Sequence, residues 1–338
     1  MKSWVRRAVL ALVVITVMAG AGFAWLYEQM QRALDAPLTL DAPELFEVPS
    51  GQSSAGLADA LATRGWLASP LFFRIEARRR GVAARIQAGT YEITSGLTPR
   101  ALLEKFVRGE VKRYAYTIVE GTTFRTLREQ LAGLPGVRVT LSGLDDAAVM
   151  AALDKPGENP EGRFFPSTYF YHHHTPDLEL LRRAYREMER LLAEAWLARG
   201  PDLPYRSPYE ALIMASIIEK ETGRADERTA IGGVFVRRLR RGMKLQTDPT
   251  VIYGLGAAFD GNLRRVDLQR DTPYNTYTRP GLPPTPIAMP GHASLRAALD
   301  PAPGDALYFV ARGDGSHEFS VTLADHQRAV RKYQLGQR

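Results

Sequence analysis

The chain has 338 residues, of which 45% are hydrophobic and 24% charged, and its formal net charge is +7 at pH 7. This composition excludes a disordered protein, and the length allows two domains with hydrophobic cores of their own. The sequence contains no cysteine, which excludes disulfides, thiolate metal sites, a cysteine nucleophile and a lipid anchor on an N-terminal cysteine.

The N-terminus carries the pattern of a membrane anchor. Lys2, Arg6 and Arg7 precede Ala8–Tyr27, a run that contains no charged residue. As a helix this run spans about 30 Å, the thickness of the hydrocarbon core of a bilayer. Because basic flanks stay cytoplasmic, we expect a cytoplasmic tail, one membrane-spanning helix and an exported remainder.

The alternative for the N-terminus is a cleaved signal peptide, because Ala19-Gly20-Ala21 resembles a cleavage site. The length of the apolar run favours a retained anchor instead, and Trp25 and Tyr27 suit the outer membrane interface. The predicted limits are a tail over 1–7, the anchor over 8–27 and a juxtamembrane linker over 28–43.

Residues 44–112 have the pattern of a small α+β module. Strands are expected at 45–48 and 89–93, and helices at 55–64, 70–80 and 99–108. The first helix turns Leu57 and Leu61 inward, and the second carries Leu71, Phe72 and Ile75.

A faint internal repeat links this module to the segment after it. The string Val48-Pro-Ser-Gly51 precedes two leucines at the same spacing as those that follow Val119-Glu-Gly121. Chance similarity of two strand–turn–helix units explains this as well as duplication does. The first copy, with V-x-x-G-x-[ST] and then L-x-x-x-L, resembles a LysM-type glycan-binding module.

Residues 113–338 are expected to form a second, mixed α+β domain. Its predicted strands lie at 114–119, 306–311 and 318–321, the last two paired, and its predicted helices at 124–131, 177–199, 211–223, 229–241 and 323–333. Between them lie long loops rich in Pro, Gly, Tyr and Asn, which in a compact domain are usually functional.

Two basic stretches stand out, Arg78–Arg80 and Arg237–Arg241. Such runs attract an anionic polymer or a membrane surface, or they form one solvated helix face, which is the interpretation we favour. No nucleic-acid partner is expected, because no recognition helix or aromatic-rich basic sheet is evident.

The segment ALIMASIIEKETG, 211–223, predicts an amphipathic helix with Glu221 near its C-terminal end. At helical spacing Glu221 lies over Met214, Ile217 and Ile218. A carboxyl group among large apolar side chains loses hydration, which raises its pKa and suits it to general acid catalysis. A solvated charge at a helix end is the alternative, and Glu219 competes for the role, although its helical neighbours are smaller.

Four strings now support a family resemblance. They are EGRFFPSTY at 161–169, SIIEKET at 216–222, LQTDPTVIYG at 245–254, and YNTY at 274–277 with GLPP at 281–284. In this order, and with the anchor and the LysM-like module before them, they resemble the YceG-like family of membrane-anchored endolytic murein transglycosylases. The resemblance implies a peptidoglycan substrate, cleavage of its glycan strand, and a catalytic Glu that matches Glu221.

The implied reaction needs one carboxyl group, whereas most glycosidases need two. Protonated Glu221 would donate to the oxygen between N-acetylmuramic acid and N-acetylglucosamine. As a carboxylate it would then accept the proton of the C6 hydroxyl, which closes on C1 of the same sugar. The product is a 1,6-anhydro end, and the attacking group is already tethered. No metal and no cofactor are implied.

The resemblance also implies a place in the cell. It implies a single-pass inner-membrane lyase whose catalytic domain lies in the periplasm. Cleavage of nascent glycan strands there would set where polymerisation ends, in association with peptidoglycan synthases, the penicillin-binding proteins.

The remaining motif residues are assigned by chemistry. Amide, phenol and hydroxyl groups suit hydrogen bonds to a sugar, so the predicted substrate-binding residues are Gln246, Tyr274, Asn275, Tyr277, Thr222 and Asp248. Asp248 alternatively caps the next turn or helix. As a second catalytic carboxylate, it would make the protein a muramidase-type hydrolase. Tyr253 fits core packing equally well, and Phe164, Phe165 and Tyr169 form either a glycan platform or buried packing.

Two histidine patterns are weaker. His172-His173-His174 suggests a metal, but adjacent side chains do not converge easily on one ion, so a loop is the preferred interpretation. His317 lies near Asp314 and Ser316 but lacks the setting of a catalytic triad. A last alternative for the whole chain is a peptidoglycan-binding scaffold in which Glu221 is structural.

Overall fold

The protein is described by a computed structural model that covers residues 3–336. Lys2 of the predicted cytoplasmic tail and the last two residues of the predicted catalytic domain therefore lie outside the described residues. The chain divides into two compact units between Tyr114 and Ala115. Both helices and strands are present, with three two-stranded sheets in the described chain, so the predicted mixed α+β class is confirmed.

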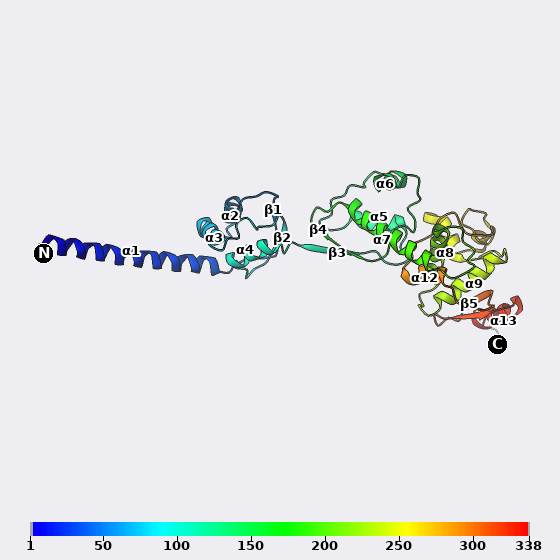
Figure 1. Cartoon of the computed structure of the whole chain (residues 1–338). Coiled ribbons are helices and arrows are strands. Elements are labelled where there is room, and N and C mark those ends of the chain that lie inside the picture. Colours follow the sequence, from blue (N-terminus) through cyan, green and yellow to red (C-terminus); the bar gives the residue numbers. More distant parts are fainter. Residues whose placement is uncertain (1–2, 337–338) are drawn as a thin grey trace. The chain divides into compact units, whose positions relative to one another are not determined.

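The first unit opens with one long helix, α1 (Ser3–Asp35) (Figure 1). Its apolar window has a mean hydropathy of 2.3 and no buried residue, so it is long and apolar enough to cross a membrane. The helix continues through the first part of the predicted linker. There Arg100 binds the carboxylate of Asp35 at 2.7 Å and the amide oxygen of Gln31 at 2.5 Å.

The rest of this unit packs two strands against three helices. Strands β1 (Glu44–Val48) and β2 (Gly89–Ile93) are antiparallel, with Glu44 opposite Ile93 and Val48 opposite Gly89. The helices are α2 (Ser54–Thr63), α3 (Pro70–Arg79) and α4 (Pro99–Arg108). Each begins where the sequence predicts, because Ser53 and Thr98 accept capping bonds and Pro70 and Pro99 lie in the first turn.

The core of the first unit confirms one predicted face and revises another. Leu57 and Leu61 are fully buried, as expected. On α3, however, Leu71 and Ile75 are exposed, and the buried positions are Phe73 and Ala77. These two lie one helical turn apart, so the helix turns a different face inward than its most apolar residues suggest. The LysM-like resemblance stays a prediction.

Strand β3 (Arg113–Thr117) crosses the boundary between the units and pairs with β4 (Thr168–His172) of the second. Between them lie α5 (Phe124–Ala132) and α6 (Asp146–Ala152), and after them comes α7 (Asp177–Leu197). Strand β4 and helix α6 were not predicted from the sequence, because five and seven residues carry little periodicity.

Three helices build the core that carries the site: α8 (Pro208–Glu221), α9 (Arg228–Arg240) and α12 (His292–Leu299). They pack on one another (Figure 1). Every residue from Ala211 to Ile218 is buried, so the prediction of an amphipathic α8 is wrong. The unpredicted α12 is one of the helices that pack against it. Gly232 permits this packing, because a Cβ there would lie 2.5 Å from the Ala297 carbonyl oxygen.

The remaining elements surround this core. They are α10 (Asp248–Leu255), the 3-10 turn Gly256–Ala258, α11 (Arg265–Gln269), β5 (Tyr308–Ala311), β6 (His317–Ser320) and α13 (Leu323–Tyr333). Strands β5 and β6 form the expected antiparallel pair, with Tyr308 opposite Ser320. Helix α13 has the predicted bounds, since the Thr322 hydroxyl caps its first turn.

Candidate active site

Glu221 is the last residue of α8, and its half-buried side chain lines a pocket of about 490 Å³. The Thr247 hydroxyl donates a hydrogen bond to Oε1 of the Glu221 carboxylate. Burial raises the pKa of Glu221 to about 7. The Thr247 bond opposes this rise, Asp248 adds to it, and His317 and Arg238 oppose it more weakly. The predicted upward shift is therefore confirmed, with desolvation as its main cause.

Glu219, the competing carboxylate, has a different environment. Its side chain is only 5% exposed, so it is largely removed from water. It binds Arg228 at 3.1 Å and accepts the Gly291 N–H at 2.9 Å. A buried carboxylate with these partners is a structural ion pair, and it lies outside the Glu221 pocket. Pairing, not the size of its neighbours, separates Glu219 from Glu221.

Two buried threonines hold Thr247, the hydrogen-bond partner of Glu221, in place. The Thr247 N–H donates to Oγ1 of Thr276 at 3.1 Å, and the Thr250 hydroxyl donates to the Thr247 carbonyl at 2.8 Å. Oγ1 of Thr250 and Oγ1 of Thr276 lie 2.9 Å apart. All three are at most 3% exposed, so the Thr247 hydroxyl is presented to Glu221 by a closed hydrogen-bond network.

Three of the predicted substrate-binding residues line the pocket with Glu221: Gln246, Asp248 and Tyr277. Gln246 and Asp248 are exposed, and the Tyr277 hydroxyl donates to Oδ1 of Asp248 at 2.6 Å. Thr247 occupies the N-cap of α10, so Asp248 lies in its first turn and is not the cap. The pocket therefore offers an amide, a phenol and a second carboxylate beside the half-buried acid.

The other three predicted residues do not line this pocket. Asn275 is 1% exposed, and its side-chain amide forms hydrogen bonds with backbone groups. Tyr274 shares a hydrogen bond of 2.9 Å with the Thr285 hydroxyl, and its ring contacts Tyr253. Thr222 is buried, and its hydroxyl accepts the Arg224 N–H at 3.0 Å where α8 ends. That Asn275, Tyr274 and Thr222 contact the substrate stays a prediction. Their hydrogen bonds indicate that they shape the site.

The aromatic residues of the first motif are packed in the protein. Phe164 is fully buried and stacks on Phe124 with ring centroids 5.2 Å apart. The Tyr169 hydroxyl donates to the Phe165 carbonyl at 2.8 Å, and the Tyr253 hydroxyl donates to the Glu161 carboxylate at 3.0 Å. None of the five lines the Glu221 pocket, which agrees with buried packing rather than a glycan platform.

The residues of β5, β6 and α13 that line one wall of the pocket were not predicted from the sequence. It includes Tyr308, His317 and His326, and the Tyr308 ring stacks on His326 at 5.2 Å. Nδ1 of His317 lies 2.7 Å from Oε2 of Glu227, ninety residues away, and the His317 N–H donates to the same carboxylate. The sequence pairs His317 with Asp314 and Ser316, but those two bond each other.

Arg238 also lies in this pocket, although it belongs to a basic run expected to be a solvated face. It is 7% exposed and donates to the carbonyl oxygens of Leu307 and Leu245 at 2.7 and 2.8 Å. The expectation fails at this position because α9 turns Arg238 toward β5. Among residues 3–336, no group of three His, Asp or Glu side chains is arranged to hold a metal ion.

The raised pKa of Glu221 makes a stability prediction. Its pKa is about 7 in the folded protein and about 4.5 when exposed, so ionisation opposes folding as the pH rises between these values. Glu221→Gln removes that penalty. We expect the variant to exceed the parent in unfolding free energy at pH 8, by on the order of 1–3 kcal/mol, and to match it below about pH 4.5.

Thermal unfolding of the two proteins across this pH range measures the difference. Glu219→Gln is the matched control, since it removes the nearer of the two carboxylates that pair with Arg228 and should lower stability at pH 8. A parent protein as stable as Glu221→Gln at pH 8 would contradict a desolvated carboxyl at this position.

The chain is similar to several known proteins. The model of the YceG-like family matches residues 46–332. An endolytic murein transglycosylase of Bacillus subtilis is 32% identical over 304 residues, which cover 85% of this chain and 83% of that protein. One from Streptococcus pneumoniae is 25% identical over 98% of this chain and 66% of its own length. A crystal structure of a YceG-like protein from Listeria monocytogenes has 28% identity and a TM-score of 0.53, covering 85% of this chain and 99% of that one.

Proposed function

This chain belongs to the YceG-like family, and from that premise we propose that it cleaves the glycan strands of peptidoglycan internally, as a lytic transglycosylase. The observation that carries the chemistry is Glu221, a carboxyl group with a pKa of about 7 in a pocket of about 490 Å³. Such a group holds its proton near neutral pH and gives it up to a leaving oxygen. The relatives are named as enzymes, which favours catalysis over a binding scaffold.

The proton transfers follow from the bonds around Glu221. Thr247 donates to Oε1, so the other carboxyl oxygen is left to carry the proton. Glu221 gives that proton to the oxygen between N-acetylmuramic acid and N-acetylglucosamine as this bond breaks. It then accepts the proton of the C6 hydroxyl, and O6 bonds to C1 of the muramic acid. The acid is restored in each cycle, and the product carries a 1,6-anhydro end.

The rest of the pocket orients the sugar. Gln246 and Tyr277 present polar groups of the kind that bind acetamido and hydroxyl groups. The Glu227 carboxylate at Nδ1 fixes the His317 ring, so that its other nitrogen is free to bond the substrate. Asp248 is engaged with Tyr277, which fits a supporting role better than that of a second nucleophile.

The membrane placement is part of the proposal. Helix α1 would anchor the chain in the inner membrane, with the basic residues at its N-terminal end on the cytoplasmic side and the chain after it in the periplasm. Tethering keeps the site near the bilayer, where nascent strands emerge beside the peptidoglycan synthases, so that cleavage terminates their growth. The LysM-like module over 44–112 would bind the same strands.

Product mass tests the reaction. Purified glycan strands digested by the full chain in detergent should yield fragments lighter by one water than those with reducing ends. Reducing ends would instead indicate a muramidase that uses Glu221 and Asp248. Asp248→Asn separates the two readings: it abolishes a two-carboxylate hydrolysis and leaves the anhydro product of a one-carboxylate reaction unchanged in mass.

A further inference from the structure

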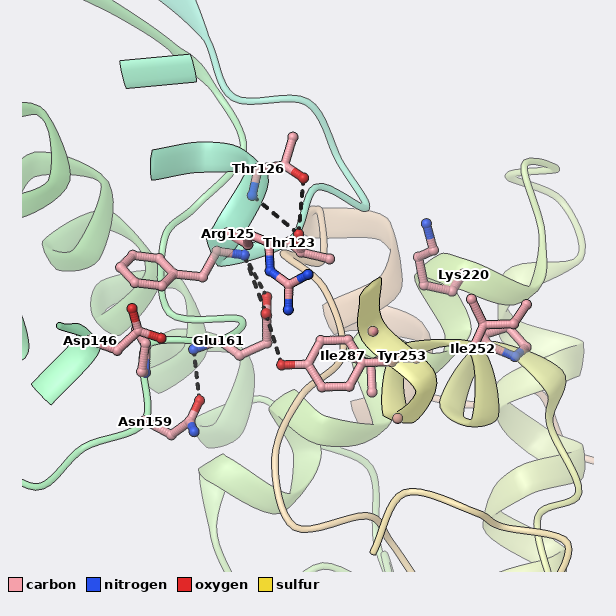
Figure 2. Close-up of a pocket in the computed structure, with 15 residues that line it drawn as sticks. Thr123, Arg125, Thr126, Asp146, Asn159, Glu161, Lys220, Ile252, Tyr253 and Ile287 are labelled. Atoms are coloured by element: carbon pink, nitrogen blue, oxygen red, sulfur yellow. Dashed lines mark hydrogen bonds between the residues drawn. The ribbon is translucent and has the colours of Figure 1, made fainter. Parts of the chain in front are cut away.

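A second pocket, of about 650 Å³, shares two of its helices, α8 and α10, with the Glu221 pocket. Its lining comes from the start of α5, the loop at 159–161, the end of α8 and the body of α10 (Figure 2). Lys220 lines it and the next residue, Glu221, lines the first pocket; Pro249 lines it and the preceding Asp248 lines the first. The two pockets are therefore lined by neighbouring residues of the same two helices, α8 and α10.

The acidic groups in this second pocket are already engaged. The Glu161 carboxylate is 4% exposed and accepts the Phe124 N–H at 3.0 Å and the Tyr253 hydroxyl at 3.0 Å, as Figure 2 shows. Asp146 binds Arg128 at 2.8 Å. Burial raises the pKa of Glu161 to about 7, so at neutral pH much of this group is uncharged. The negative charge that the pocket presents to a ligand is therefore small.

The basic groups are not engaged in the same way. Arg125 and Lys220 are both exposed. Within residues 3–336, Arg125 makes no hydrogen bond or ion pair, and Lys220 makes one bond of 3.4 Å to the Gly121 carbonyl. The charge that this pocket leaves unpaired is therefore positive. Next to it lie Pro249, Ile252 and Ile287, which suit small apolar side chains.

We propose that the second pocket binds a carboxylate of the peptide that the glycan strand carries, with Arg125 and Lys220 as its binding residues. Guanidinium groups bind carboxylates through two parallel hydrogen bonds, and an ammonium adds a point charge. The Glu221 pocket would hold a sugar while the peptide on that strand lies over α10, the helix that helps line both pockets. This inference rests on the proposed function, since it takes peptidoglycan as the substrate.

Binding to a protein that does not cleave tests this site. Full-length Glu221→Gln in detergent is titrated with glycan strands of one length, either bearing their peptides or stripped of them. We expect tighter binding of the peptide-bearing strands, by about tenfold. Adding Arg125→Ala and Lys220→Ala should remove that preference, with binding of stripped strands retained. The preference should also weaken as salt is raised.

A charge-matched control is Arg186→Ala with Arg265→Ala, two exposed residues outside both pockets, which should keep the preference. Equal binding of the two strands by the parent, or a preference that survives loss of Arg125 and Lys220, overturns the inference. Vesicles of phosphatidylglycerol and of phosphatidylcholine form a second arm. If only vesicle binding falls in the double variant, the pocket holds a lipid phosphate and the peptide site is wrong. The proposed function fails separately, by the absence of anhydro ends.

Discussion

Glu221→Gln should abolish glycan cleavage, with a loss of about 10²–10⁴-fold in rate, the usual contribution of a general acid. Glutamine keeps the size of the side chain and can still accept the Thr247 hydrogen bond, but it has no proton to give. The change therefore removes the chemistry and leaves the pocket. Release of fragments from purified strands by the full chain measures the rate, and co-sedimentation with intact strands measures retained binding.

The pH dependence of the parent protein gives an independent reading. The acid must hold its proton at the start of each cycle, and its pKa is about 7. Cleavage should therefore fall tenfold per pH unit as the pH rises well above about 7. Glu221→Gln should show a flat residual rate. Cleavage by that variant at the rate of the parent would remove Glu221 from the mechanism, whatever its pKa.

Asn275→Ala should destabilise the second unit by about 2–4 kcal/mol, because it strands several backbone groups at once. The Asn275 amide nitrogen donates to the carbonyl oxygens of Asp267, Leu268 and Arg270 at 2.7 to 3.2 Å. Its oxygen accepts the N–H groups of Tyr277 and Thr278. These bonds hold the loop that carries Thr276 and Tyr277, so activity should fall along with stability.

This result separates architecture from substrate binding. Asn275→Asp has the same shape but loses the donors, so it should also lower the unfolding midpoint. Gln246→Ala is the control, since Gln246 is exposed in the pocket and its loss should raise KM with little change in unfolding. If Asn275→Ala instead raises KM and unfolds like the parent, Asn275 contacts the sugar, as its residue type suggested.

Local features of the site were predictable from the chain. The helix that carries Glu221 is marked by Ser207 and Pro208 at its start, and the apolar residues before Glu221 indicate desolvation. Bounds such as those of α4 and α13 follow from caps and periodicity, which act within a few residues. Gln246 and Asp248 were predicted in the same way, because both belong to the short string that begins at Leu245.

Partnerships across the chain were not predictable. Nothing near His317 in sequence indicates Glu227, and nothing near Glu221 indicates Thr247 or Arg238. Asn275 reads as a sugar ligand by its chemistry, and only its burial assigns its amide to the backbone. Glu219 and Glu221 lie two residues apart on one helix. Arg228 pairs with Glu219, whereas burial raises the pKa of Glu221 to about 7.

The sequence by itself determined the helices and strands with strong periodicity, the apolar N-terminal run and the family, and it singled out Glu221 as the candidate acid. Only the tertiary structure decided which polar groups converge on Glu221, that α7, α9, α10 and α12 pack around α8, and that a second pocket uses residues of α8 and α10. The physical reason is one of range: caps and periodicity act over one or two turns, whereas the pKa of a carboxyl depends on every group packed around it.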